Sequence, residues 1–269
     1  MRKMQHSLHI ILALLCLIPY ALLSCERAPV AEDDDVALAR AAVAKRDWPL
    51  AERLLRRSLR TEQDPDRRWE AWNMLLTSAN AEGEEPRVTL EYLEVMLEEF
   101  SENEARTKAI LERMGRCAEM LRRFSRAADI WSSYIGLAGL EPEEAVTGYR
   151  HLAQAHFSRR LFEAGEEVLH QCLSLFLSDH DKILCMYDIA DQNMARQRWQ
   201  EVAGISQQIL DSNPDEKLRG LASYLLADAL EQMGRGKEAL AQFEQARAVY
   251  PNPAVIDNRI AYLRKKIKQ

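Results

Sequence analysis

The sequence predicts an all-α protein, and three observations lead to this fold class. Leu, Ala, Glu and Arg, which are strong helix formers, dominate the composition. Only 10 Gly and 9 Pro occur in 269 residues, which leaves few turns for a β-rich fold. Small and large apolar residues also recur every 37 to 39 residues, a period typical of helical-repeat proteins.

Residues 1–24 have the pattern of a secretory signal peptide. The basic start MRKMQH is followed by an apolar segment of about fifteen residues. This segment is short for a membrane span, which needs roughly 20 residues, and Pro19 interrupts it. An uncleaved membrane anchor with an incidental cysteine is the alternative interpretation.

The end of this segment, Leu22-Leu23-Ser24-Cys25, resembles the bacterial lipobox. The resemblance implies cleavage before Cys25 and acylation of its thiol and new amino group. Glu26 stands where the inner-membrane retention signal of enteric bacteria has Asp, which favours the periplasmic face of the outer membrane. Residues 25–35 end in an acidic run, and we expect them to form a solvated tether that also places negative charge at the start of the first helix.

A repeat extends over residues 36–252. The segment LADALEQMGRGKEALAQFEQARAVYP, from Leu226 to Pro251, resembles a tetratricopeptide repeat (TPR) in its large and small helix positions, its turn glycine and its closing proline. The equivalents of its Ala239 are Ala51, Val88, Ala127, Gly165 and Val202. Twelve residues before these anchors stand Ala39, Leu76, Gly115, Ala153, Ala190 and Ala227, each preceded by an aliphatic residue. The resemblance implies a right-handed solenoid of about six helix pairs that bury their apolar stripes by stacking.

Other features mark the ends of the repeats. Asp64-Pro65, Glu141-Pro142 and Asn213-Pro214 fall between units, as does a capping box of Ser101 with Glu104. The second unit, residues 69–100, departs most from the pattern, since it has Val88 as anchor and Glu85 in place of an aromatic residue.

Residues 253–269 follow the last repeat and are predicted to form a capping helix. Ile256, Ile260, Leu263 and Ile267 make one apolar stripe, and the basic residues lie mostly on other faces. Such a cap gives the terminal repeat a polar outer surface. Docking of this basic helix on anionic lipid or on a partner is the alternative.

We find no pattern for catalysis, for a metal or for a cofactor. Gly234-Arg235-Gly236-Lys237 lacks the other residues of a phosphate-binding loop and fits the turn of a repeat. The histidines have no zinc-site spacing, and His156 falls on a packing position. The net charge of −6 becomes −8 once Arg2 and Lys3 leave with residues 1–24, which argues against a general nucleic-acid binder. A disulfide between Cys172 and Cys185 remains open, because their separation in space does not follow from the sequence.

In the TPR family, the first helices of successive pairs line a concave groove that holds a peptide or a partner's helix. The resemblance places on that groove a polar set with a few aromatic residues: Arg40, Asn73, Thr77, Asn80, Glu112, Arg116, Arg150, Gln154, Phe157, Tyr187, Asp191, Tyr224 and Asp228. This mixture suits a peptide site, in which aromatic anchors supply most of the energy and polar groups fix the register. A merely solvated polar face is the alternative.

A lipobox followed by helical repeats resembles the plan of envelope-assembly lipoproteins of the barrel-assembly and secretin-pilotin types. The Tyr-Pro-rich stretch expected of the first type is replaced by RTEQDPDRRWEA. The resemblance implies a lipid-anchored, non-enzymatic scaffold that binds another envelope protein or peptide. A periplasmic binding module for peptidoglycan fragments or a small ligand, lined by Phe157, Tyr187 and Tyr224, is the second hypothesis, and an enzyme subunit is the third.

Overall fold

The computed structural model describes residues 34–83, 86–175 and 178–267, and these residues form thirteen α-helices and no strand. They divide into two compact units, which we describe separately: unit 1 extends to Gly83 and unit 2 begins at Glu84. The predicted signal peptide and Cys25 lie outside the described residues. In the described ranges, no helix is both long and apolar enough to cross a membrane.

Unit 1 consists of α2 (Asp35–Ala44), α3 (Trp48–Thr61) and α4 (Pro65–Glu82). Its core contains small and large side chains in alternation, including the fully buried Ala39, Ala51 and Leu55. Asp64 caps α4, whose first residue is Pro65, as predicted from the Asp-Pro pair.

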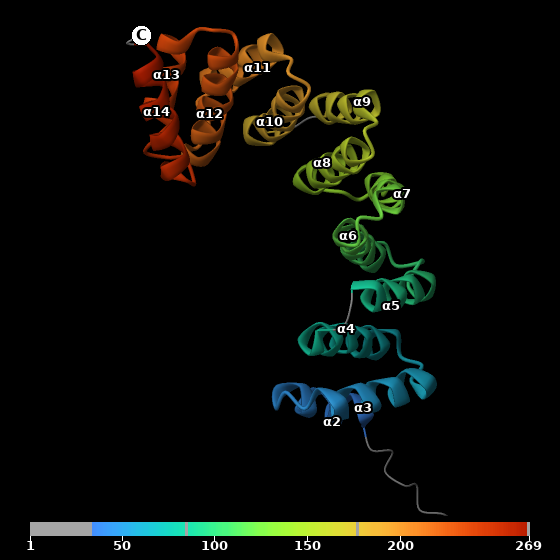
Figure 1. Ribbon diagram of the computed structural model, residues 1–269. Helices are drawn as coiled ribbons and strands as arrows, with labels where there is room; N and C mark the ends of the chain where they lie inside the picture. The colour runs from blue at the N-terminus through green and yellow to red at the C-terminus, as the bar shows by residue number, and fades with distance from the viewer. Residues whose placement is uncertain (1–33, 84–85, 176–177, 268–269) are drawn as a thin grey trace, which may run out of the picture. The chain divides into compact units, whose positions relative to one another are not determined.

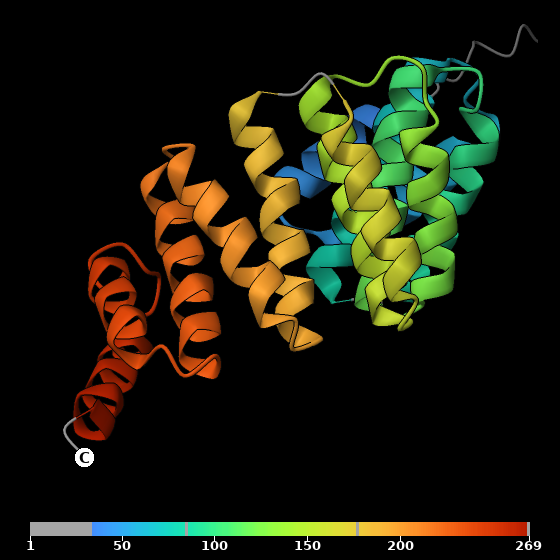
Figure 2. The ribbon, with the colours of Figure 1, turned by 90° about the horizontal axis from the view of Figure 1, so that it is seen from above.

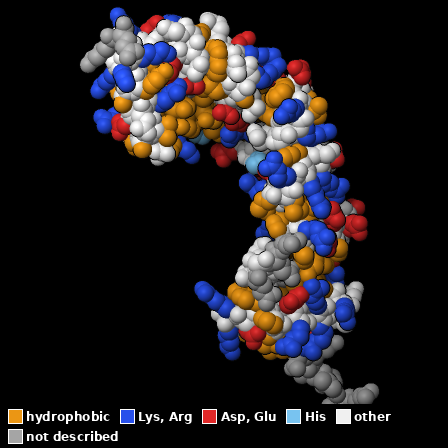
Figure 3. Space-filling view, viewed as in Figure 1, with side chains coloured by type: hydrophobic (Ala, Val, Ile, Leu, Met, Phe, Trp, Pro, Cys, Tyr) orange, Lys and Arg blue, Asp and Glu red, His pale blue; other side chains and the backbone are white. Residues whose placement is uncertain are grey.

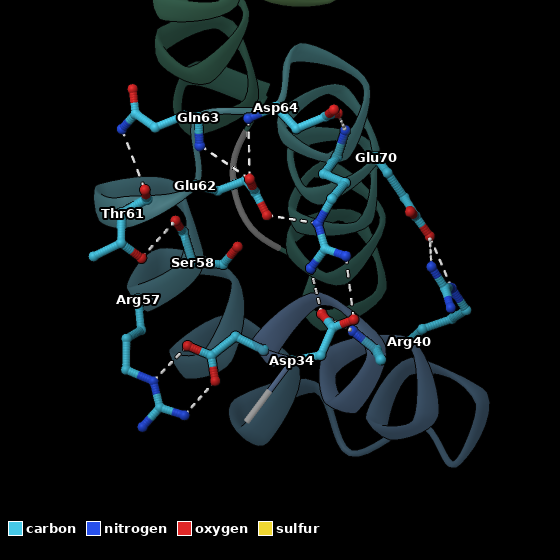
Figure 4. A network of polar contacts seen from close by, with 12 residues as sticks. Asp34, Arg40, Arg57, Ser58, Thr61, Glu62, Gln63, Asp64 and Glu70 are labelled. Carbon is cyan, nitrogen blue, oxygen red and sulfur yellow. Dashed lines mark hydrogen bonds and ion pairs between the residues drawn. The ribbon is translucent and has the colours of Figure 1, made fainter. Parts of the chain in front are cut away.

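Ion pairs fix the start of unit 1 (Figure 4). The Arg67 guanidinium donates to Asp34 at 2.5 Å and to Glu62 at 2.6 Å, and this bonding to Arg67 lowers the pKa of Asp34. Asp34 also caps α2 by accepting from the amide of Ala37 at 3.1 Å, and Asp35 pairs with Arg57. The predicted negative charge at the start of the first helix is thus confirmed, but both carboxylates are held by the folded unit and are not part of a free tether.

Unit 2 contains the remaining helices: α5 (Pro86–Glu99), α6 (Glu104–Met120), α7 (Phe124–Ile135), α8 (Pro142–Ser158), α9 (Phe162–Leu173), α10 (Asp179–Ala195), α11 (Trp199–Asp211), α12 (Glu216–Gln232), α13 (Gly236–Ala246) and α14 (Pro253–Ile267). Each helix packs on the next, and α10 also contacts α8 and α12. Figure 1 shows α8, α10 and α12 along the inner curve of this unit, with α7, α9 and α11 outside. In Figure 2, which is seen from above, the helices lie lengthwise and consecutive helices run back and forth. The predicted all-α TPR-like fold is confirmed.

The backbone repeats as regularly as the side chains. Five residues before each of the six anchors, the chain adopts a left-handed conformation, at Arg46, Gly83, Arg122, Arg160, Gln197 and Gly234. This conformation ends the first helix of a pair, and in five of the six turns the next amide then bonds to the carbonyl five residues earlier, as from Leu161 to His156 at 3.0 Å. The aromatic residues Trp48, Phe124, Phe162 and Trp199 each begin the second helix of a pair. Even the irregular second pair keeps this turn, with Gly83 at φ 75°.

Three details differ from the sequence-based expectations. Leu38, which belongs to the aliphatic series, is 45% exposed, because among the described residues no helix precedes α2 to cover it. Asn103 caps α6 in place of Ser101, since its side chain accepts from the amide of Arg106, while Glu104 instead accepts from the amide of Gly139. The second pair is divided between the units, with α4 in unit 1 and α5 in unit 2.

A disulfide joins α9 to α10. Cys172 and Cys185 are both fully buried, and their Cα atoms lie 6.6 Å apart. Val146 of α8 belongs to the same apolar cluster. The structure therefore settles the pairing that the sequence left open, whereas Cys117 is a buried free thiol.

Candidate functional site

The inner surface of unit 2 is formed by facing residues of its first helices. Two rows run along it, because equivalent residues of adjacent repeats are 37 or 38 positions apart and residues four apart share a helix face. One row is Glu112, Arg150, Tyr187 and Tyr224, and the other is Arg116, Gln154, Asp191 and Asp228. We refer to these residues of α6, α8, α10 and α12 as the inner surface.

Most charges on the inner surface are paired within the chain. Arg150 of α8 donates to both oxygens of Asp188 on α10, at 2.5 and 3.0 Å. Arg259 of α14 pairs with Asp228 and, at 2.8 Å, with Glu231, both on α12. Arg116 pairs with Glu112 on its own helix at 2.9 Å. The pairs of Arg150 and Arg259 connect different helices, and all of these pairs restrict the side chains that form them.

Three tyrosines gather at the C-terminal part of this surface. The rings of Tyr224 and Tyr250 stack with centroids 4.8 Å apart, and Tyr224 meets Phe243 edge-on at 5.8 Å. Tyr250 belongs to the chain between α13 and α14, which reaches α12 at Gly220. A Cβ at Gly220 would lie 2.8 Å from the Val249 carbonyl oxygen, so a glycine permits this close approach.

Tyr187 on α10 shares this environment. Burial, together with the nearby Asp191, Tyr250 and Asp188, raises the pKa of Tyr187 to about 12. Burial likewise raises the pKa values of Tyr224 and Tyr250. All three phenols therefore stay neutral at physiological pH and offer aromatic faces with a polar tip.

Asp191 differs from the other carboxylates of this surface. It is exposed, and unlike Asp188 and Asp228 it has no hydrogen bond or ion pair among the described residues. The surrounding protein and the neighbouring Asp188 raise its pKa above the usual value. In Figure 3, acidic side chains lie in the hollow of unit 2 next to hydrophobic ones near α10 and α12.

One predicted groove residue does not belong to this surface. Phe157 is only 7% exposed, and its ring packs against Gly165 of α9, where a Cβ would lie 2.4 Å from it. Phe157 is the penultimate residue of α8, three positions before the left-handed Arg160, and there it lies in the contact between the two helices of its own pair. The prediction that Phe157 lines a partner or ligand site is therefore wrong.

The N-terminal members of the predicted groove lie in unit 1. Arg40 pairs with Glu70 at 2.6 Å, and Asn73 and Thr77 bond to carbonyls one turn earlier on α4. Asn80 lies on the same helix. Sequence reasoning also missed Asp188, Arg259 and Tyr250. The repeat spacing does not indicate Asp188, because the equivalent of Arg150 on α10 is Tyr187 and Asp188 lies one position further on, and no spacing points to Tyr250.

The described residues contain no group of three or more His, Cys, Asp or Glu side chains placed to hold a metal ion. His156 is half-buried, as its packing position predicts, but its Nδ1 has no hydrogen-bond partner in the part of the chain that the structure describes. Burial lowers its pKa, which keeps the ring neutral.

Comparison with solved structures supports the fold. RapI aligns over 87% of this chain and 71% of its own length, with a TM-score of 0.61 and 10% identity. The quorum sensor NprR from B. thuringiensis aligns over 85% and 67%, with a TM-score of 0.58 and 12% identity. A tetratricopeptide repeat protein from Parabacteroides merdae aligns over 85% and 97%, with a TM-score of 0.51 and 14% identity. No protein-family model matches the chain, and the comparison with curated proteins gives no match either. At these identities the likeness shows the fold alone, which is that of a TPR-like helical solenoid.

Proposed function

We propose that this protein is a non-enzymatic scaffold that binds another protein or a peptide on the inner surface of unit 2. One observation carries the proposal: the surface combines three clustered tyrosines with accessible polar side chains held in fixed positions by ion pairs between repeats. Rigid aromatic anchors surrounded by oriented polar groups are typical of sites that recognise extended peptides or helices.

We further propose that Cys25 is acylated and anchors the chain at the periplasmic face of the outer membrane, where the partner would be another envelope protein. The lipobox at residues 22–25 supports this location. The buried disulfide between Cys172 and Cys185 fits it as well, because disulfides persist in oxidising compartments such as the periplasm. The binding-module alternative is weaker, since Phe157 does not contribute to the proposed lining.

The binding proposal is tested with two matched glutamine variants. Gln154 is exposed on the inner surface, and Gln245 is exposed on α13, the second helix of its pair. Gln154→Arg adds a charge and bulk where the partner would lie, so we expect it to lose partner proteins that the wild-type chain retains when captured from cell envelopes. Gln245→Arg should retain them. Equal retention by all three chains would contradict a site on the inner surface.

The anchoring proposal makes a separate prediction. Cys25→Ala removes the only thiol that the lipobox offers for acylation, so the variant should leave the membrane fraction during a carbonate wash, whereas the wild-type chain stays. Cys117→Ala serves as the control, because that thiol is buried in unit 2. A Cys25→Ala chain that stays membrane-bound would contradict the lipid anchor.

A further inference from the structure

The charges of the inner surface are unbalanced. Between α8 and α14, the four carboxylates of Asp188, Asp191, Asp228 and Glu231 face two guanidiniums, those of Arg150 and Arg259, which leaves a net charge of −2. Both guanidiniums are already engaged in ion pairs. An anionic ligand would find no unengaged cation among these groups.

Asp191 is where the excess charge is accessible. Neither neighbour in the same row supplies a cation to Asp191. Gln154 is neutral, and Asp228 is a carboxylate that pairs with Arg259. A carboxylate surrounded by protein and by another carboxylate has an elevated energy when ionised, which agrees with its raised pKa. A cation beside it would relieve this repulsion and form a charge-assisted hydrogen bond.

Aromatic faces lie next to this carboxylate. Tyr187 is one helical turn from Asp191 on α10, and Tyr224 lies at the equivalent place on α12, stacked on Tyr250. Tyrosine faces attract guanidinium and ammonium groups, and they also accommodate the apolar stems of Arg and Lys side chains. The Asp191 carboxylate and the tyrosine rings therefore both favour a ligand with a guanidinium or ammonium group.

We propose that the inner surface recognises a basic segment of the partner protein, with an Arg or Lys side chain at Asp191 beside Tyr187 and Tyr224. This inference rests on the proposed function and specifies the chemistry of its partner. It also accounts for an unpaired carboxylate at a position where an asparagine would fit without electrostatic cost.

The test is a selection of peptides from a randomised twelve-residue library displayed against the full chain in mild detergent. We expect the selected peptides to be enriched in Arg and Lys, and their affinity to fall with rising salt concentration. Asp191→Asn should weaken their binding about tenfold or more, the effect of losing one hydrogen bond between charged groups. Asp129→Asn, the same change at an exposed carboxylate on α7, should leave affinity unchanged.

Because the ionised Asp191 is unpaired, Asp191→Asn is expected to melt at or above the wild-type temperature, so lost affinity would not reflect unfolding. The selected peptides could bind the wild-type chain and lose binding to Gln154→Arg, yet be neither basic nor sensitive to Asp191→Asn. That result would overturn the basic-segment inference and leave the proposed function standing. Selected peptides that bind Gln154→Arg as well as the wild-type chain would contradict both.

Discussion

Trp131→Ala is expected to lower the free energy of unfolding of unit 2 by about 4 kcal/mol, the usual cost of removing a large buried aromatic side chain. Trp131 is fully buried and connects three helices. Its ring stacks on His151 of α8 at 4.5 Å, and its Nε1–H donates to Glu119 of α6 at 2.8 Å. Gly115 of α6 leaves room for the ring, since a Cβ there would lie 2.4 Å from it.

The effect should appear as a fall of roughly 8–16 °C in melting temperature for a unit of this size. In a solenoid each repeat is stabilised mainly by its neighbours, so amide hydrogen exchange should quicken first in α6, α7 and α8. Trp199→Ala is the matched control, because Trp199 is only half-buried at the start of α11. Similar melting of the two variants would show that Trp131 does not hold the repeats together.

The second large effect concerns the disulfide between α9 and α10. Cys172→Ala with Cys185→Ala is expected to destabilise unit 2 by about 3 kcal/mol, because the bridge closes a short loop and restricts the unfolded chain. Addition of a reductant should lower the melting temperature of the wild-type chain by a similar amount and have no effect on the double variant.

Cys117→Ala provides the control for this experiment. Cys117 is a buried free thiol whose pKa is raised by burial, so it reacts slowly and forms no bridge. Its variant should respond to reductant as the wild-type chain does. A double variant as stable as the wild-type chain, or one that still responds to reductant, would show that the bridge contributes nothing to stability.

Most of the fold follows from the sequence because it depends on local repetition. Close approach of helices requires small residues at fixed places, and the structure buries Ala39, Ala153 and Ala227 where the repeat spacing puts them. The turns are equally regular. Their left-handed conformation at Arg122, Arg160 and Gln197 could not be predicted from a glycine, because these positions have none. Leu38 departs from this regularity. It lies on α2, the first described helix, where no preceding helix covers the position that is covered in the other pairs.

The candidate site was less predictable, because it depends on contacts outside the repeat. Repeat register alone assigned Phe157 to the groove, but Gly165 opposite it provides a space that the aromatic ring fills. Tyr250 contributes from an irregular segment, and Arg259 reaches back from the capping helix to Asp228. Register predicts which helix face a residue occupies, whereas pairing and side-chain burial depend on how neighbouring elements pack.

The capping helix itself agrees with its predicted role. Ile256, Ile260 and Leu263 are buried, and α14 packs on α13. Two of its basic side chains are engaged within the chain, Arg259 on α12 and Arg264 with Glu244 of α13 at 2.7 Å. These pairs favour a structural cap over a basic docking surface.

The central claim is that a partner protein binds the inner surface of unit 2, and photo-crosslinking in living cells tests it most directly. A photoreactive amino acid replaces Gln154 in one variant and Gln245 in the other, two exposed positions on different helices of unit 2. We predict that position 154 yields one discrete crosslinked protein and that position 245 yields none. Crosslinks to that protein from position 245 alone, or none from either position, would contradict binding on the inner surface.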